Sequence, residues 1–294
     1  MSKTGFIAIV GRPNVGKSTL MNTVLGEKVA IVSSKPQTTR NRILGILTRG
    51  ENQYVFIDTP GIHRPKNALG DYMVRTANAS MQGADAVILV ADAGYEISPV
   101  EQNVIAYLKS AGVPGILALN KVDLYRREQI AETIAAYAAL HSFAAVVPIC
   151  AKNGKNVDEL LDECTPFLSP SDWFFPEDAV TDQPERQVAA EIIREKLLRT
   201  LNKEVPHGVA VVIDRYVDEK SMVSIYATIY CEKPSHKGII VGKGGEELKR
   251  VGSYARADLE KLLGVRVYLN LWVKVKENWR DSARGVTDFG YSDE

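Results

Sequence analysis

Cysteine is scarce in this 294-residue sequence, and its three cysteines lie far apart. Cys150, Cys164 and Cys231 lack the spacing of metal ligands, which favours reduced thiols in a cytoplasmic protein. No apolar run approaches the roughly 20 residues that span a bilayer, and no basic leader precedes an apolar segment. Any membrane contact is therefore expected to be peripheral, at the inner face of the cell membrane.

Net charge is absent as well, because 36 basic residues balance 36 acidic ones. From Arg186 to the end there are 19 basic and 16 acidic residues, so the second part is only mildly basic. This imbalance is too small to argue for a nucleic-acid partner. Only a local cluster of basic residues could support such a partner. The length and the 45% hydrophobic content are sufficient for two domains with a core each.

The first part alternates short apolar runs with helical patterns. Continuous apolar strands separated by helices predict a mostly parallel, doubly wound α/β sheet, with its ligand beyond the carboxyl ends of the strands. The expected strands are residues 5–10, a polar pair within 43–58, and residues 86–92, 115–121 and 145–151.

Residues 169–185 contain three prolines and five acidic residues but no basic residue, so we expect a linker. Its aromatic residues, Trp173, Phe174 and Phe175, are expected to pin it onto a domain surface. We set a first domain at residues 1–170, a linker at 171–185 and a smaller α+β domain at 186–294.

The second domain has the predicted order α-β-β-α-α-β. A helix covers residues 186–201, strands cover 208–217 and 222–231, a short turn covers 234–238, and a last strand covers 265–275. We expect Ile239, Ile240 and Val241 to form an apolar face in the core.

The stretch GRPNVGKSTL fits the phosphate-binding pattern G-x-x-x-x-G-K-[ST] between a predicted strand and a predicted helix. Gly11 and Gly16 let backbone N–H groups close around phosphates. Lys17 would reach the β and γ phosphates, and the Ser18 hydroxyl would bind Mg²⁺. A plain strand-turn-helix is the alternative, and the flanking elements disfavour it.

The stretch DTPG ends the next apolar strand, where the Asp58 carboxylate can hold Mg²⁺ through water and the Gly61 N–H can sense a γ-phosphate. Between the two motifs, residues 35–42 are polar, and Thr39, in preference to Thr38, could complete the magnesium shell in an order-disorder switch. An exposed loop with solvated arginines is the alternative. Ile62 follows DTPG, and its apolar side chain cannot orient a water, so slow hydrolysis is expected with that group supplied from elsewhere.

The stretch NKVD indicates the base. A buried Asp123 carboxylate accepts hydrogen bonds only, which suits the N1–H and N2–H₂ edge of guanine and not adenine. A helix cap is the alternative for this motif. The triplet Cys150-Ala151-Lys152 ends the last strand and would add a backbone N–H toward the guanine oxygen.

The second domain contains a G-x-x-G loop, Gly242 to Gly245, next to a long helix. Such a loop lets a nucleic-acid backbone approach closely, with Lys243 and the helix N-terminus facing phosphate. The loop alone equally suits a helix-capping turn, but the α-β-β-α-α-β order is that of a type II KH domain. Basic side chains cluster around the loop, namely Lys233, Lys237, Lys249 and Arg250, while His236 is expected to be a polar surface residue.

Taken together, these motifs resemble those of the bacterial Era GTPases. GRPNVGKSTL, PQTTRNRI, DTPGIH, NKVD and CAK are similar to the five guanine-nucleotide motifs in order, and IIVGKGGEELKRVG, LNLWVKVKENWRD and DFGYS are similar to the Era KH domain and tail. The resemblance spans nearly the whole chain. It implies a GTP-dependent factor that binds the 3′ end of small-subunit ribosomal RNA, assists maturation of the small ribosomal subunit and associates peripherally with membranes. It also implies that Asn14 helps to hold K⁺, and Cys150 stands where many relatives have Ser.

The predicted sites are as follows. Catalytic roles are assigned to Lys17, Thr39, Asp58 and Gly61, and magnesium ligation to Ser18, Thr39 and Asp58. GTP or GDP is assigned to Gly11, Arg12, Pro13, Asn14, Val15, Gly16, Lys17, Ser18, Thr19, Asp58, Thr59, Pro60, Gly61, Ile62, Asn120, Lys121, Asp123, Cys150, Ala151 and Lys152. RNA is assigned to Lys237, Gly242, Lys243, Gly244, Gly245, Lys249 and Arg250.

The leading hypothesis is a monomeric switch in which GTP orders residues 35–42 and 58–70 and thereby sets the RNA affinity of the second domain. Two alternatives stay open. A passive RNA-binding scaffold with a remnant nucleotide site is disfavoured by the intact Lys17, Ser18, Asp58 and Asp123. A GTPase acting in RNA modification or cell-cycle control, without contact to ribosomal RNA, is disfavoured by the KH pattern.

Overall fold

The computed structural model describes residues 1–94 and 96–292, and the chain divides into two compact units. Unit 1 comprises residues 1–64 and 73–182, and unit 2 comprises residues 65–72 and residues from 183 onward. The domain limits set from the sequence, with a linker at 171–185, remain predictions. The last two residues of the predicted second domain lie outside the described residues.

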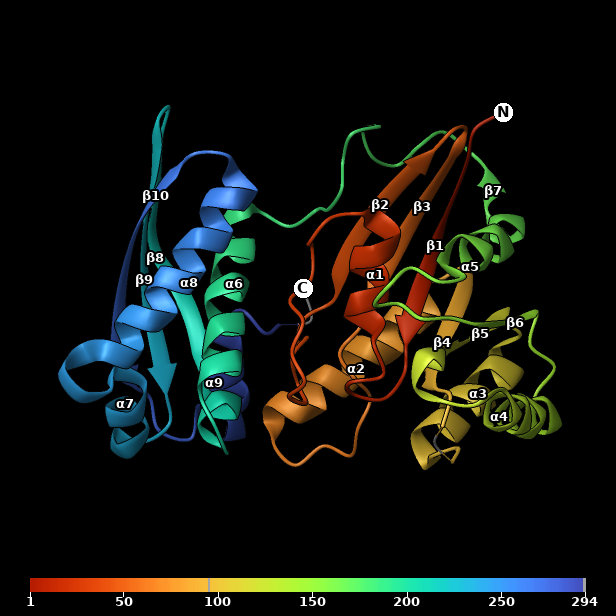
Figure 1. Cartoon of the computed structure of the whole chain (residues 1–294), viewed down its shortest axis with the longest axis horizontal. Helices are drawn as coiled ribbons and strands as arrows, with labels where there is room; N and C mark the ends of the chain where they lie inside the picture. Colours follow the sequence, from red (N-terminus) through yellow and green to blue (C-terminus); the bar gives the residue numbers. More distant parts are fainter. Residues whose placement is uncertain (95, 293–294) are drawn as a thin grey trace. The chain divides into compact units, whose positions relative to one another are not determined.

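A seven-stranded sheet forms the centre of unit 1 (Figure 1). Its main order is β2-β3-β1-β4-β5-β6, and the short β7 pairs with the start of β1. Only β2 and β7 run antiparallel to their neighbours, which confirms the mostly parallel sheet. The strands are β1 (Lys3–Val10), β2 (Ile43–Arg49), β3 (Asn52–Asp58), β4 (Ala86–Asp92), β5 (Gly115–Asn120), β6 (Ala145–Pro148) and β7 (Ser169–Pro170).

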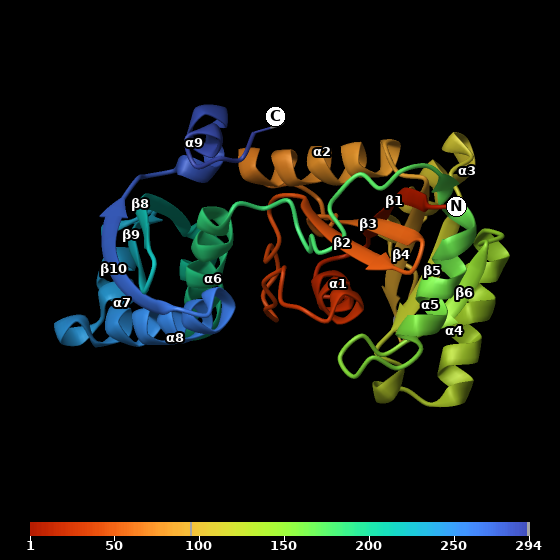
Figure 2. The same cartoon turned by 90° about the horizontal axis from the view of Figure 1, so that it is seen from above.

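Helices cover both faces of this sheet, as continuous apolar strands require. On one face α1 (Lys17–Leu25) and α5 (Val157–Cys164) bury Leu20 and Leu160 against Ile9. On the other face lie α2 (Ala68–Gln82), α3 (Pro99–Ala111) and α4 (Arg127–Leu140), and Figure 2 shows α1 and α2 on opposite sides. Two 3₁₀ turns, η1 (Val122–Leu124) and η2 (Thr165–Phe167), complete the unit. The doubly wound fold is confirmed.

Residues 171–182 are bound along the β2–β3 edge of the sheet. Gln53 holds them, because its Oε1 accepts from the N–H groups of Phe174 (2.9 Å) and Phe175 (3.0 Å). The Phe174 ring stacks on Phe6 with centroids 5.3 Å apart, and Trp173 Nε1 donates to a backbone carbonyl 3.1 Å away. The expectation that the aromatic residues pin this segment to a domain surface is confirmed.

Unit 2 packs two helices on one face of a three-stranded sheet (Figures 1 and 2). The sheet order is β10-β9-β8, with β9 antiparallel to β8 and parallel to β10. The elements are α6 (Glu185–Thr200), η3 (Val205–Gly208), β8 (Ala210–Glu219), β9 (Met222–Cys231), α7 (Pro234–Val241), η4 (Lys243–Gly245), α8 (Glu246–Leu263), β10 (Arg266–Val275), η5 (Trp279–Asp281) and α9 (Ala283–Thr287). This is the predicted α-β-β-α-α-β order.

Two local expectations for unit 2 were wrong. The predicted turn at residues 234–238 is the beginning of α7, because Pro234 occupies the first helical turn, where its missing N–H costs nothing. Of the expected apolar face 239–241, Ile240 is fully buried and Val241 packs against the core, but Ile239 is 51% exposed. Successive helical residues point about 100° apart, so three in a row span about 200° and cannot all face the core.

The described helices lack the combination of length and hydropathy that a membrane crossing requires. The three cysteines are buried free thiols, and burial raises the pKa of Cys164 to about 12. A thiol of that pKa is almost entirely protonated at neutral pH and correspondingly unreactive.

Candidate functional site

The phosphate-binding loop joins β1 to α1, and its two glycines are required by close approaches. Gly11 has φ +149°, and a Cβ there would lie 2.3 Å from the carbonyl oxygen of Val90. Gly16 has φ +108° and caps α1, and a Cβ there would lie 2.2 Å from Asn120 Nδ2. Both positions therefore exclude side chains, and the loop is held against β4 and β5.

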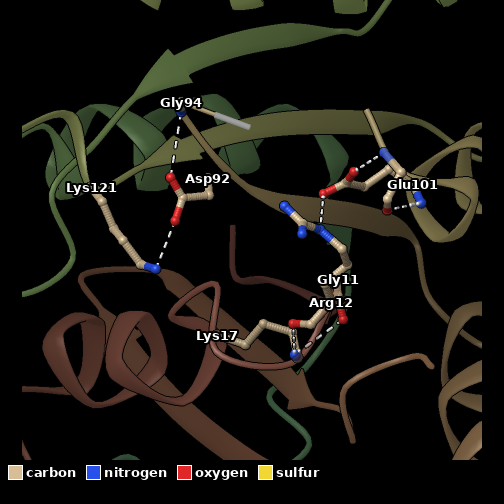
Figure 3. A network of polar contacts seen from close by, with 8 residues as sticks. Gly11, Arg12, Lys17, Asp92, Gly94, Glu101 and Lys121 are labelled. Carbon is tan, nitrogen blue, oxygen red and sulfur yellow. Dashed lines mark hydrogen bonds and ion pairs between the residues drawn. The ribbon is translucent and has the colours of Figure 1, made fainter. Parts of the chain in front are cut away.

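Lys17 is buried under this loop. Its Nζ donates to the carbonyl oxygens of Gly11 (3.1 Å) and Arg12 (2.9 Å), as Figure 3 shows. Burial lowers the pKa of Lys17 to about 8, and the carboxylate of Asp58 partly opposes this shift. The ammonium group is thus held in place before a phosphate arrives.

The Arg12 side chain points toward α3. Its Nε donates to Glu101 Oε1 on α3 at 2.8 Å, away from Lys17 (Figure 3). Glu101 is fully buried, and its other carboxylate oxygen accepts from the Ser98 N–H in a capping box. Arg12 therefore anchors the phosphate-binding loop to α3.

The three residues predicted to hold magnesium converge. Ser18 Oγ lies 2.8 Å from Thr39 Oγ1 and donates to Asp58 Oδ2 at 2.6 Å. Thr39 Oγ1 lies 3.3 Å from the same carboxylate oxygen, whereas Thr38 Oγ1 donates to the Lys35 carbonyl at 2.7 Å.

The second oxygen of that carboxylate makes the arrangement suitable for a cation. Among the described residues, Asp58 Oδ1 is buried and has no hydrogen-bond partner. Burial raises the pKa of Asp58, while Lys17 and the hydroxyls of Ser18 and Thr39 lower it. A set of hydroxyl and carboxylate oxygens is the donor set that Mg²⁺ prefers, so these residues fit the ion.

Asn120 ties the base-binding motif to the phosphate-binding loop. Its Nδ2 donates to the Val15 carbonyl at 2.7 Å, and its Oδ1 accepts from the Ala151 N–H at 2.9 Å. Lys121 follows with φ +65°, and its Nζ pairs with Asp92 Oδ2 at 2.7 Å, as Figure 3 shows. Three chain segments therefore meet at the end of β5.

The expected burial of Asp123 was wrong, and the expectation for the triplet at residues 150–152 becomes more specific. Asp123 is exposed at the cavity instead of buried, because it lies in the short η1 turn that follows β5. In the triplet at residues 150–152, the Ala151 N–H already bonds Asn120, and the Cys150 N–H donates to the Lys155 carbonyl at 3.1 Å. The Lys152 N–H is therefore the donor of this triplet that can face a base.

These segments enclose a cavity of about 570 Å³ beyond the carboxyl ends of the parallel strands. The predicted residues that line it are Pro13, Asn14, Gly16, Lys17, Ser18, Thr19, Thr39, Gly61, Asn120, Lys121, Asp123, Cys150 and Lys152. Predicted residues outside the lining set are Gly11, Arg12, Val15, Asp58, Thr59, Pro60, Ile62 and Ala151. Several of these hold the walls, as when Thr59 Oγ1 donates to the Ile9 carbonyl at 2.8 Å.

Sequence reasoning missed part of the wall. The cavity is also lined by Ile31, Val32, Ser33, Ser34, Gln37 and Leu124. The apolar run at residues 29–32 was the available signal, because it belongs to no predicted strand or helix. In addition, Arg40 is only 1% exposed, which contradicts the alternative of solvated loop arginines for this residue, whereas Arg42 is exposed.

The predicted RNA site of unit 2 centres on the loop between α7 and α8. Gly242, Gly244 and Gly245 all have positive φ, and a Cβ on Gly242 would lie 2.7 Å from that of Glu247. Lys243 and Lys249 are exposed there, as is Lys237 on α7. Arg250 is also exposed but pairs with Glu247, so it contributes less positive charge than expected.

A groove of about 460 Å³ begins at this loop and runs between α8 and β10. It is lined by Gly245, Leu248, Lys249, Gly252, Ser253, Arg256 and residues 267–271. Apolar and basic groups therefore share its walls. Such a groove can hold single-stranded nucleic acid by burying bases and pairing phosphates.

Fold and sites together define a P-loop guanine-nucleotide-binding protein that carries a KH domain. Residues 6–121 match the family described as 50S ribosome-binding GTPase, and residues 204–280 match the KH domain family. The chain is 49% identical over 296 residues to GTPase Era of Clostridioides difficile strain 630, with all of both chains covered. It is 50% identical over 291 residues to GTPase Era of Alkaliphilus oremlandii, covering 98% of this chain and 99% of the relative.

Solved structures agree with these sequence matches. Era in complex with MgGDPNP and nucleotides 1506–1542 of 16S ribosomal RNA superposes with a TM-score of 0.95 at 40% identity, covering 99% of this chain and all of the other. A single-residue variant of Aquifex aeolicus Era bound to GDP and AlF₄⁻ gives the same TM-score and identity, with 99% of each chain covered. The chain belongs to the Era family of GTPases.

Proposed function

We propose that the chain hydrolyses GTP with Mg²⁺ as cofactor and uses the nucleotide state to control RNA binding by unit 2. The observation that supports GTP hydrolysis is the convergence of Ser18, Thr39 and Asp58 beside the buried ammonium of Lys17. Mg²⁺ held there would neutralise charge that develops on the β and γ phosphates. Gly61 lines the same cavity and offers its N–H to the γ-phosphate.

We also propose a potassium ion beside the phosphates. Asn14 lines the cavity, and its Nδ2 donates to the Ser34 carbonyl at 2.7 Å. This contact directs the amide nitrogen toward the protein and leaves Oδ1 as a potential ligand for a cation. Replacing KCl by NaCl should slow hydrolysis in the wild type, and the Asn14→Ala variant should lose that salt dependence.

The RNA partner we propose is the single-stranded 3′ end of small-subunit ribosomal RNA. Its support is the groove beside the G-x-x-G loop, together with the RNA bound by the 40%-identical Era structure. We further propose that the chain assists maturation of the small ribosomal subunit as a monomer. A cytoplasmic location is supported by the three free thiols and by the family resemblance, and we propose peripheral membrane contact on the resemblance alone.

The coupling between the two sites follows from linkage. We propose that GTP orders residues 35–42 and 58–70 and thereby raises the RNA affinity of unit 2. If GTP strengthens RNA binding by some factor, RNA must strengthen GTP binding by the same factor. Measuring both affinities therefore provides an internal check on the switch.

The test is RNA binding by anisotropy, using a labelled oligonucleotide of the rRNA 3′ end with the protein loaded with GDP or a non-hydrolysable GTP analogue. Replacing Lys243 and Gly244 with Asp should weaken binding by at least tenfold, because two carboxylates would face phosphate. The variant should stay folded, since a Cβ at Gly244 meets no atom within 4 Å, and the positive φ of +62° should cost an Asp only about 1 to 2 kcal/mol. Equal RNA affinity in both nucleotide states would refute the switch.

A further inference from the structure

Residue 62, which directly follows DTPG, cannot supply a polar group for the attacking water. Ile62 is apolar and packs against a core cluster with Met81 and Val104. Its backbone N–H donates to the Gly11 carbonyl at 3.2 Å, which fixes the chain at this point. If the chain orients water with a side chain, that side chain comes from another segment.

Gln37 has a polar side chain and lies in the wall of the cavity where the γ-phosphate is expected. It lines the cavity together with Thr39 and Gly61, which are expected to flank a γ-phosphate. Its backbone has φ +61°, a conformation that non-glycine residues adopt rarely and usually where surrounding contacts impose it. A carboxamide can accept a hydrogen bond from water through its oxygen and donate through its nitrogen.

His63 holds this carboxamide. Gln37 Nε2 lies 3.2 Å from His63 Nε2, and His63 Nδ1 lies 2.9 Å from the Gly61 carbonyl oxygen. The carbonyl can only accept, so Nδ1 of His63 donates to it, and in this tautomer Nε2 presents a lone pair. Gln37 must therefore donate from its amide nitrogen, which leaves Oε1 pointing away from the ring as an acceptor.

We propose that Gln37 orients the attacking water through Oε1 and that His63 is the residue that positions Gln37. The inference rests on the proposed GTP hydrolysis at this site. The water oxygen forms a bond to the γ-phosphorus while the bond from that phosphorus to the β,γ-bridging oxygen breaks. GDP leaves with the electron pair, and the water proton ends on the released inorganic phosphate. Gln37 fixes the direction of attack and takes up no proton.

The first experiment separates chemistry from binding. Single-turnover hydrolysis of GTP by the Gln37→Ala variant should be about 10- to 100-fold slower than in the wild type, the range expected for a misoriented reactant. Affinity for a fluorescent non-hydrolysable GTP analogue should change less than about threefold, because no nucleotide contact is assigned to Gln37. A variant that hydrolyses GTP at the wild-type rate overturns the inference.

The second experiment uses two substitutions of His63 that keep different nitrogens. In His63→Asn the amide nitrogen occupies the place of Nδ1, so the bond to the Gly61 carbonyl is kept and the contact with Gln37 is lost. In His63→Gln the amide reaches the place of Nε2, so its oxygen can still accept from Gln37. We expect His63→Asn to be as slow as Gln37→Ala and His63→Gln to recover most of the rate.

The reverse order, with His63→Asn active and His63→Gln slow, would show that the Gly61 contact matters and would overturn the role of Gln37. The double variant Gln37→Ala, His63→Asn should be no slower than either single variant if the two residues act as one unit. Additive losses would overturn the positioning role. Absence of hydrolysis in the wild type would instead refute the proposed function, which keeps the two failures distinguishable.

Discussion

Proton uptake on nucleotide binding provides a direct test of the buried lysine in the phosphate-binding loop. Burial lowers the pKa of Lys17 to about 8 in the nucleotide-free protein. The phosphates of GDP would restore the charged form, so its pKa should rise on binding. The deprotonated fraction before binding is about 0.1 at pH 7 and about 0.75 at pH 8.5, from the titration of a single group. Binding should therefore take up about 0.1 and about 0.75 proton at those pH values.

The sign of the pH dependence follows from the same numbers. Because the bound state carries the extra proton, affinity for GDP should fall as the pH rises through about 8. Between pH 7 and pH 8.5 the loss should be about fourfold, or about 0.8 kcal/mol.

Isothermal titration calorimetry of GDP binding, repeated in buffers with different ionisation enthalpies, measures the proton uptake. The same titration at pH 7 is the control, since Lys17 is charged there in both states. Uptake near zero at pH 8.5, with pH-independent affinity, would refute the assignment of a perturbed lysine beside the phosphates.

Three further predictions concern the site. Thr39→Ala should weaken Mg²⁺-dependent binding of a GTP analogue by about tenfold, as expected for losing a bond to a charged group, whereas Thr38→Ala should leave it within about twofold. Filter binding over a range of Mg²⁺ concentrations checks this, and equal losses would contradict the choice of Thr39. Gly11→Ala should destabilise the fold by about 3 kcal/mol or more, whereas Gly26→Ala, with φ +70° and open space around its Cβ, should cost about 1 kcal/mol in urea unfolding. Asp123→Asn should lower GTP affinity by about 100-fold and favour xanthosine triphosphate, because the amide nitrogen can donate to the second carbonyl of xanthine. Competition binding measures this change, and unchanged guanine preference would place the base elsewhere.

The elements whose sequence signal is local were predictable. The long strands were predicted within a few residues, since those of unit 1 are mostly continuous apolar runs and those of unit 2 alternate apolar and polar residues. The positions of Gly11 and Gly16 were also readable, because a fixed motif spacing encodes a loop that admits no side chain. The convergence of Ser18 with Asp58 followed from strand order, since parallel strands end at one edge of a sheet.

The features that the sequence did not predict depend on contacts between distant segments of the chain. Nothing in the sequence shows that the Arg12 side chain pairs with Glu101, a residue 89 positions later. The triplet at residues 150–152 was expected to offer a backbone N–H to the base, and nothing in the sequence shows that Asn120 accepts the N–H of Ala151. Pro234 was read as a turn residue, although proline is equally suited to the first turn of a helix. Each of these residues had two compatible roles, and only tertiary contacts chose between them.

Asn120 shows why the phosphate and base motifs behave as one structure. Its single carboxamide bonds the Val15 carbonyl on one side and the Ala151 N–H on the other, and it is almost fully buried. A carboxylate at this position could accept from Ala151 but would face the Val15 carbonyl without a proton, so only an amide satisfies both partners. The same nitrogen lies 2.2 Å from the position that a Cβ on Gly16 would occupy, too close for any side chain there. The close approach of Asn120 to Gly16 therefore requires both residues. A change at either position would disturb the phosphate-binding loop and the base motif together.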